Sequence, residues 1–110
     1  MAFSQLSVDA LRGVLEEAIS FEFGMDKHEE LGGFYEVDGL YYRAKYPNGY
    51  GVSIIKHHYS IGGNHDKWEL AVLNGGTLCY STPITDDVLG YLDDEEVCEL
   101  CRRIRDLSPS

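Results

Sequence analysis

Three of the four histidines stand close together in the segment KHHYSIGGNHD, residues 56–66. Histidine beside an acidic residue is the donor set of a zinc site, which needs four ligands converging on one ion. His57 and His58 are adjacent in a predicted strand, so their side chains point to opposite faces and cannot both reach one ion. His65 and one neighbour would supply only two ligands. The segment therefore predicts a hairpin loop, with no metal and no cofactor.

The two glycines of this loop, Gly62 and Gly63, raise a second reading as a phosphate-binding nest. A phosphate loop leads into a helix, and no helix start follows here. Asp66 next to the glycines would also repel an anion. A small enzyme or a ligand binder built on the loop His57–Asp66 stays an alternative, and we expect no enzyme.

The segment CELC places Cys98 and Cys101 in a C-x-x-C motif, which is typical of redox and metal sites. The motif lies inside a predicted helix and not at its N-terminus, where the helix would stabilise a thiolate. We therefore expect both cysteines to pack against the core as small apolar side chains. With Cys79 the count is odd, which indicates free thiols in a reducing compartment.

The elements that position these residues follow a helix–sheet–helix order. Apolar residues recur at helical spacing over 7–21, where Ser7 or Ser4 is a candidate N-cap. They recur again after Asp93, which forms a D-x-x-E capping box with Glu96. Between them the spacing changes to that of strands. The strands are predicted over 34–37, 40–46, 50–58, 67–73 and 77–81.

Tight turns are predicted between these strands at Asp38-Gly39, at Pro47-Asn48-Gly49 and at Asn74-Gly75. Such turns force neighbouring strands to run antiparallel. The sequence thus predicts a single α+β domain over residues 1–110. An N-terminal helix and a C-terminal helix pack on an antiparallel meander of four to five strands, as two layers.

The charge is strongly acidic, with 19 acids against 9 bases and a formal net charge of −10. This charge disfavours direct binding of nucleic acid or of anionic membranes, and it favours basic protein partners. No apolar run approaches the ~20 residues of a membrane span. The N-terminal segment lacks the pattern of a signal peptide. We therefore expect a cytoplasmic protein.

The acids are densest between residues 85 and 99, where seven acids occur without a base. Solvated helix faces explain such a run most simply. The sharper hypothesis is a surface that imitates the phosphates of DNA and occupies a basic groove. Its predicted contact residues are Asp86, Asp87, Asp93, Asp94, Glu95 and Glu96.

Eight tyrosines form the second candidate surface, and five of them crowd the first half of the predicted sheet. Exposed tyrosine is typical of binding surfaces. We therefore predict that Tyr41 and Tyr42 contact a partner. Packing inside the sheet and a homodimer formed through the sheet face are the alternatives.

Four motifs in residues 47–107 resemble a family of small, functionally uncharacterised phage and prophage proteins. They are a Y-G-x-S-(V/I)-(V/I) strand at Tyr50–Ile55, a Y-S-x-G-G loop at Tyr59–Gly63, a W-E-L-A-V-L strand at Trp68–Leu73 and a T-P-(I/V)-T-D-D-V segment at Thr82–Val88. The resemblance implies a phage-type origin and no known activity.

Acidity and resemblance together predict a non-enzymatic interaction protein in a bacterial host cell. It would inhibit a host protein that handles nucleic acid or serves in defence, in the manner of an anti-CRISPR protein, by mimicry of DNA or by steric blockade. A self-associating structural module of a phage is the alternative.

Overall fold

The computed structural model describes residues 3–24, 27–30, 35–75, 77–79, 82 and 88–109, and of residues 27–30 and 35–38 it describes the backbone. The elements are α1 (Val8–Leu15), β1 (Ser20–Gly24), β2 (Lys27–Glu30), β3 (Tyr35–Lys45), β4 (Tyr50–His57), a 3-10 turn (Gly63–His65), β5 (Trp68–Asn74), β6 (Thr77–Leu78), β7 (Leu89–Leu92) and α2 (Asp94–Arg105). The predicted α+β fold is confirmed.

Every strand pair of the sheet is antiparallel, and β1, β3, β4, β5 and β6 follow one another across it. β2 also pairs with β3, and β7 also pairs with β5. The predicted turns at Pro47-Asn48-Gly49 and Asn74-Gly75 are confirmed. Gly49 and Gly75 adopt φ angles of 90° and 63°, which glycine tolerates without strain.

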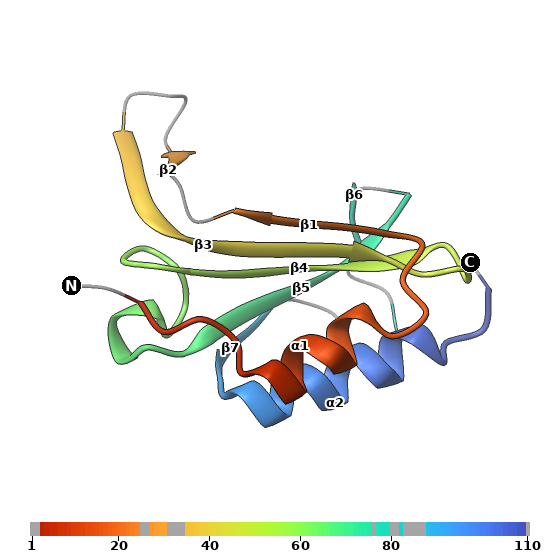
Figure 1. Ribbon diagram of the computed structural model, residues 1–110. Helices are drawn as coiled ribbons and strands as arrows, with labels where there is room; N and C mark the ends of the chain where they lie inside the picture. The colour runs from red at the N-terminus through yellow and green to blue at the C-terminus, as the bar shows by residue number, and fades with distance from the viewer. Residues whose placement is uncertain are drawn as a thin grey trace.

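Both helices cover the same face of the sheet, so the fold has two layers (Figure 1). Tyr42, Ile54 and Leu70 are paired in register across β3, β4 and β5, and none is more than 2% exposed. They form the floor of the core under the helices. The next residue of each strand points to the other face, where no described helix packs.

The two helices run parallel, although they come from opposite parts of the chain (Figure 1). Ser7 caps α1 by accepting a hydrogen bond from the backbone N–H of Ala10, and its own N–H donates to Asp94 at the start of α2. At the other end, Arg105 of α2 reaches the carbonyl of Gly13 in α1. A side-chain carbon at Gly13 would collide with the sulfur of Cys98, so glycine permits this close approach.

The predicted hairpin at Asp38-Gly39 is wrong, because both residues lie inside the continuous strand β3. The two strands expected over 34–37 and 40–46 are therefore one. Gly39 faces His57 of β4, and an added Cβ would lie 2.6 Å from the carbonyl oxygen of Lys56. Glycine is needed here because β3 and β4 approach each other closely, and not because the chain turns.

The predicted helix over 7–21 is also too long, since α1 ends at Leu15. Glu17 adopts a φ of 61°, which breaks the helical path, and Ile19 already donates its N–H to the carbonyl of Lys45. The chain that follows α1 forms the strands β1 and β2. Helical spacing alone did not reveal that edge strands follow.

No helix in the described part of the chain is long and apolar enough to cross a membrane.

Candidate protein-binding surface

The acidic residues at the start of α2 mostly accept hydrogen bonds within the protein. The Asp93 carboxylate accepts from the N–H of Glu96 at 2.8 Å, and the Glu96 carboxylate accepts from the N–H of Asp93 at 3.1 Å, which confirms the predicted capping box. Asp94 accepts from the N–H of Ser7 and from the indole N–H of Trp68, each at 2.8 Å. Only Glu95 of this run is an exposed acid without such a role in the described structure.

The acidity of this end has a physical cause in the parallel helices. Their N-termini lie together, and each carries a partial positive charge from aligned peptide dipoles. Carboxylates at Asp9, Asp93, Asp94 and Glu96 offset that charge. The predicted contact residues therefore divide, because Asp93, Asp94 and Glu96 stabilise the helix start while Glu95 faces solvent. Asp86 and Asp87 lie outside the described residues.

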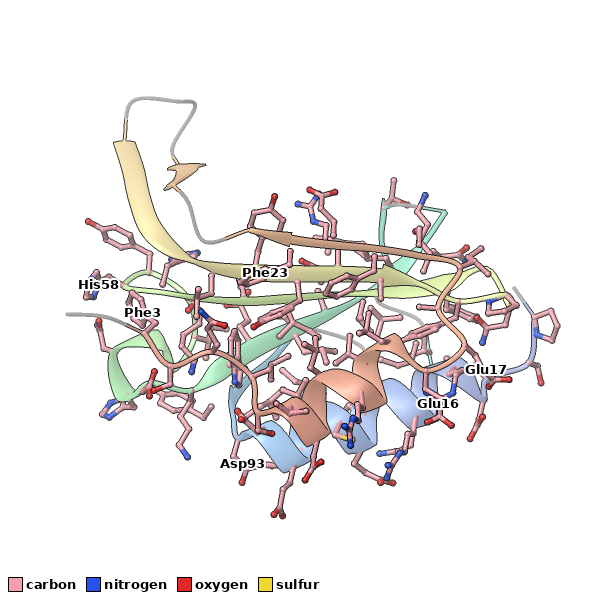
Figure 2. All side chains as sticks on the ribbon, in the orientation of Figure 1. Phe3, Glu16, Glu17, Phe23, His58 and Asp93 are labelled. Carbon is pink, nitrogen blue, oxygen red and sulfur yellow. The ribbon has the colours of Figure 1, made fainter. Side chains whose placement is uncertain are left out.

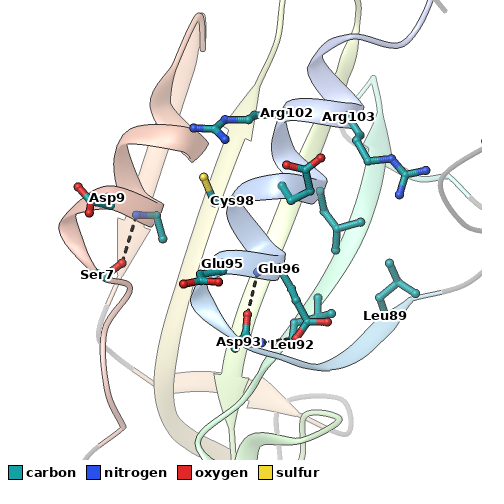
Figure 3. A pocket seen from close by; sticks show the side chains of 13 residues that line it. Ser7, Asp9, Leu89, Leu92, Asp93, Glu95, Glu96, Cys98, Arg102 and Arg103 are labelled. Atoms are coloured by element: carbon teal, nitrogen blue, oxygen red, sulfur yellow. Dashed lines mark hydrogen bonds between the residues drawn. The ribbon is translucent and has the colours of Figure 1, made fainter.

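A shallow hollow of about 900 Å³ runs along both flanks of α2 (Figure 3). On the α1 side it is bordered by Asp9 and Cys98, and on the β7 side by Leu89 and Arg103. Its charged rim mixes acids with arginines. In the part of the chain that the structure describes, no three His, Cys, Asp or Glu side chains are grouped to hold a metal ion.

A buried lysine joins the N-terminal segment to the sheet at this same end. Lys56 is 1% exposed, and its ammonium group lies 4.0 Å from the centre of the Trp68 ring. It donates to the carbonyl of Ser4 at 2.8 Å and to the carboxylate of Asp66 at 3.0 Å. Asp66 also accepts from the N–H of Ser4 at 2.9 Å. We call Ser4, Lys56, Asp66 and Trp68 the lysine clasp.

The clasp changes the acidity of Asp66. Partial burial by itself raises the pKa of this carboxyl group, but hydrogen bonds from Ser4 and then from Lys56 outweigh that effect. The pKa of Asp66 is therefore held below its usual value, so the carboxylate stays charged at neutral pH.

The histidine segment forms the loop between β4 and β5, as predicted. His57 is buried, and its ring nitrogen accepts the N–H of Tyr59. His58 is exposed, 2.9 Å from the side-chain oxygen of Asn64, and its ring meets Phe3 edge-on (Figure 2). His65 turns toward Tyr91, with ring centres 5.7 Å apart. The three rings thus have three different surroundings.

An exposed apolar patch forms where this loop meets β7. Ile61 is 44% exposed and Tyr91 59% exposed, and the N–H of Tyr91 donates to the carbonyl of Ile61 at 3.3 Å. Carboxylates lie close by in the sequence, because Asp66 follows His65 and Asp93 lies two residues after Tyr91. Asp66 and Asp93 line a surface hollow together with Glu95. We call this the acidic–aromatic surface, formed by Ile61, His65, Asp66, Tyr91, Asp93 and Glu95.

Tyr91 displays its ring from a strained backbone. Its φ is 56°, in the left-handed region that large side chains rarely adopt. The surroundings hold it there, because Gly62 packs against its backbone and a Cβ at Gly62 would lie 2.8 Å from the nitrogen of Tyr91. Strain of this kind costs roughly 1–3 kcal/mol and concentrates at functional sites.

The predicted contact tyrosines lie on opposite faces of β3. Tyr42 is 2% exposed, stacks on Phe23 and meets Trp68 edge-on, so its assignment to a partner surface is wrong. Strand alternation required that one of the two neighbours face the core. Tyr41 is half-buried on the face without helices, and its hydroxyl donates to Glu22 at 3.0 Å.

The cysteines of α2 pack as predicted for apolar side chains. Cys101 is fully buried, and burial raises the pKa of its thiol to about 12. Cys98 is half-buried against Gly13. Cys101 therefore stays protonated and belongs to the core.

No protein-family model, no curated protein and no solved structure matches this chain. The candidate site thus depends on geometry. The sequence did not reveal Ile61 and Tyr91 as candidate contact residues. The exposure of Tyr91 follows from its positive φ angle, which no local sequence motif predicts.

Proposed function

We propose that the chain is a non-enzymatic binding protein that blocks a basic, nucleic-acid-binding surface of a host protein. The acidic–aromatic surface is the observation that supports this proposal. It combines the exposed apolar side chains of Ile61 and Tyr91 with a hollow lined by Asp66, Asp93 and Glu95. Protein interfaces likewise combine apolar side chains with polar ones.

The chemistry of this surface suits arginine. A guanidinium group stacks on a tyrosine ring and also forms paired hydrogen bonds with carboxylates. Tyr91 and the carboxylate of Glu95 offer both kinds of contact. A groove that binds nucleic-acid phosphates is rich in such cations, so the protein and the nucleic acid would compete for it. Lys67 also lines the acidic hollow, which limits the net charge of the rim.

The phage-type resemblance of the sequence favours a partner in the cytoplasm of a bacterial host. A nuclease of a defence system, such as a CRISPR effector, is the most concrete case. Inhibition would be steric, since the bound protein would occupy the channel that the nucleic acid needs.

The test starts with a pull-down from bacterial lysate, followed by competition with purified components. We expect the captured protein to bind nucleic acid, and we expect this chain to displace that nucleic acid. Affinity should fall as salt rises, because exposed charges are screened beyond ~8 Å at 0.15 M salt. A captured protein that binds its nucleic acid and this chain at the same time would contradict blockade.

Two matched pairs of variants locate the contact surface. Glu95→Lys and Asp106→Lys change the net charge equally at opposite ends of α2, and we expect only Glu95→Lys to weaken binding at least tenfold. Tyr91→Asn removes the ring but tolerates the positive φ. It should weaken binding, whereas Tyr41→Ala on β3 should not. The reverse result would move the contact surface to the open face of the sheet.

A further inference from the structure

The edge strand β1 carries apolar side chains that the helix layer leaves partly uncovered. Phe21 and Phe23 are paired in register with Ala44 and Tyr42, so they lie on the helix side of the sheet. They are nevertheless 39% and 38% exposed. Figure 2 shows Phe23 between β1 and the helix layer.

The cause is the position of α1, which packs against α2 and not over β1. Gly13 of α1 meets Cys98 of α2, and the side of α1 away from α2 carries Val8, Leu11 and Leu15 at helical spacing. Val8 is 66% exposed and Leu15 is 38% exposed. Ile19, which lies just before β1, is 67% exposed. We call these residues the apolar strip: Val8, Leu11, Leu15, Ile19, Phe21 and Phe23.

The strip runs beside an open strand edge. β1 is the last strand on its side of the described sheet and pairs only with β3. An edge strand presents backbone N–H and C=O groups to any further strand of suitable shape. Apolar side chains next to such an edge favour addition of a strand over exposure to water.

The sequence of β1 fits a second copy of itself. Ser20-Phe21-Glu22-Phe23-Gly24 reads almost the same in both directions about Glu22. Antiparallel pairing centred on Glu22 places Phe21 of each copy opposite Phe23 of the other, so the dimer contains two such pairs. We propose that β1 pairs with β1 of a second copy, giving a two-fold dimer with one continuous sheet and four phenylalanines on the helix side.

Charge on the other face of β1 sets the strength of this dimer. Glu22 of one copy would lie opposite Glu22 of the other, and like charges in that position repel. Each carboxylate already accepts the Tyr41 hydroxyl, and Arg43 is its cross-strand neighbour. The net charge of −10 per chain adds repulsion between the copies. We therefore expect a weak dimer that high salt strengthens, opposite to the salt effect expected for a basic partner.

Sedimentation of the pure chain at low and high salt tests the dimer. We expect the average mass to rise toward two chains as protein concentration increases, and to rise further in 0.5 M salt as screening improves. Phe21→Lys should stay monomeric, with circular dichroism and melting temperature confirming its fold. A wild-type chain that remains a monomer at the highest concentration in high salt would overturn the proposal.

Cysteine crosslinking tests the register. Residues directly opposite across antiparallel strands have Cα atoms roughly 4.5–5.5 Å apart, within disulfide range. Under a mild oxidant, Glu22→Cys should therefore form a crosslinked dimer. The matched control is Ser20→Cys. Ser20 lies on the same face of β1 as Glu22, but in this pairing the Ser20 residues of the two chains would be about 13 Å apart along the strands. Equal crosslinking of both variants, or none above the wild-type chain, would refute this pairing. Binding of a host partner is scored separately, so either proposal can fail alone.

Discussion

The two ends of the helix layer use opposite chemistry to hold the same pair of helices. At the end where both helices begin, Asp93 and Asp94 accept hydrogen bonds from backbone and indole N–H groups. At the end where both helices finish, Arg105 donates to the carbonyls of Gly13 and Glu16. Figure 2 shows Asp93 at one end of the layer and Glu16 and Glu17 at the other.

The finishing end combines an arginine whose side chain is only 9% exposed with an asparagine from the turn between β3 and β4. Arg105 lies 3.4 Å from the carboxylates of Glu16 and Glu17, although its Nε has no partner with hydrogen-bond geometry among the described residues. The side-chain amide of Asn48 donates to the carbonyls of Ile104, Arg105 and Leu107 at 2.9–3.1 Å.

The comparison shows how parallel helices are accommodated. Side by side, their dipoles place like partial charges together at each end, which is unfavourable unless opposite charges are added. Acceptors at one end and donors at the other provide them. The beginning end also contains the buried cation Lys56, so loss of a residue there should destabilise the protein more than loss at the finishing end.

Removal of the lysine of the clasp should give the largest effect. Lys56→Ala leaves a cavity beside Trp68 and removes the donor to Ser4 and Asp66. We expect a loss of about 3 kcal/mol in the free energy of unfolding, measured by urea denaturation. Lys56→Met fills the space and should lose about half as much. Equal losses would show that packing contributes nothing and would contradict this account.

Asp94 should come next. Asp94→Ala leaves the indole N–H of the fully buried Trp68 and the N–H of Ser7 without their acceptor. The expected loss is about 2 kcal/mol. Glu95→Ala, the neighbouring exposed acid, is the matched control and should change stability by less than about 0.5 kcal/mol. Similar losses in both variants would mean that net charge, and not these hydrogen bonds, matters at this end.

Asn48→Ala at the finishing end should cost about 1.5 kcal/mol, because the carbonyls of Ile104 and Arg105 in the last turn of α2, and that of Leu107 just beyond it, lose one shared donor. Asn48→Asp has nearly the same shape and places a carboxylate against those carbonyls, so it should cost more. A loss larger than that of Asp94→Ala would reverse the comparison between the two ends.

The pH dependence of the clasp should be the smallest effect. Because the folded pKa of Asp66 is lowered from 3.8, its stabilising contribution is present above that value and is lost as the pH falls through the folded pKa. The difference in unfolding free energy between wild type and Asp66→Asn should be constant above about pH 5 and shrink below it. Glu99→Gln corrects for the change in net charge. A difference that grows in acid would contradict the hydrogen bonds assigned to Asp66.

Local signals in the sequence predicted the parts of the fold that depend on local chemistry. The capping box at Asp93, the cap at Ser7 and the turn at Gly49 each need only nearby residues. The same rules failed at Asp38-Gly39, where contact with β4 decides the conformation. Parallel packing of α1 on α2 likewise depends on residues far apart in the chain.

The candidate site was less predictable for the same reason. Alternation along β3 implied that only one of Tyr41 and Tyr42 could face outward, but it did not say which one. Asp94 was recognised as part of an unusual acidic run, while its hydrogen bonds from the distant donors Ser7 and Trp68 were not visible in the sequence. Burial of Lys56 against Trp68 runs against the usual behaviour of lysine and has no local signal.

The parallel pairing of the helices also sets the order of events during synthesis. α1 is complete about 80 residues before α2 begins, which at ~5–20 residues per second is several seconds of translation. During that interval α2 is absent, so α1 has no helix to pack against. An isolated helix of this length is only marginally stable in water. We therefore expect the apolar face of α1 to stay available to chaperones until α2 has left the ribosome.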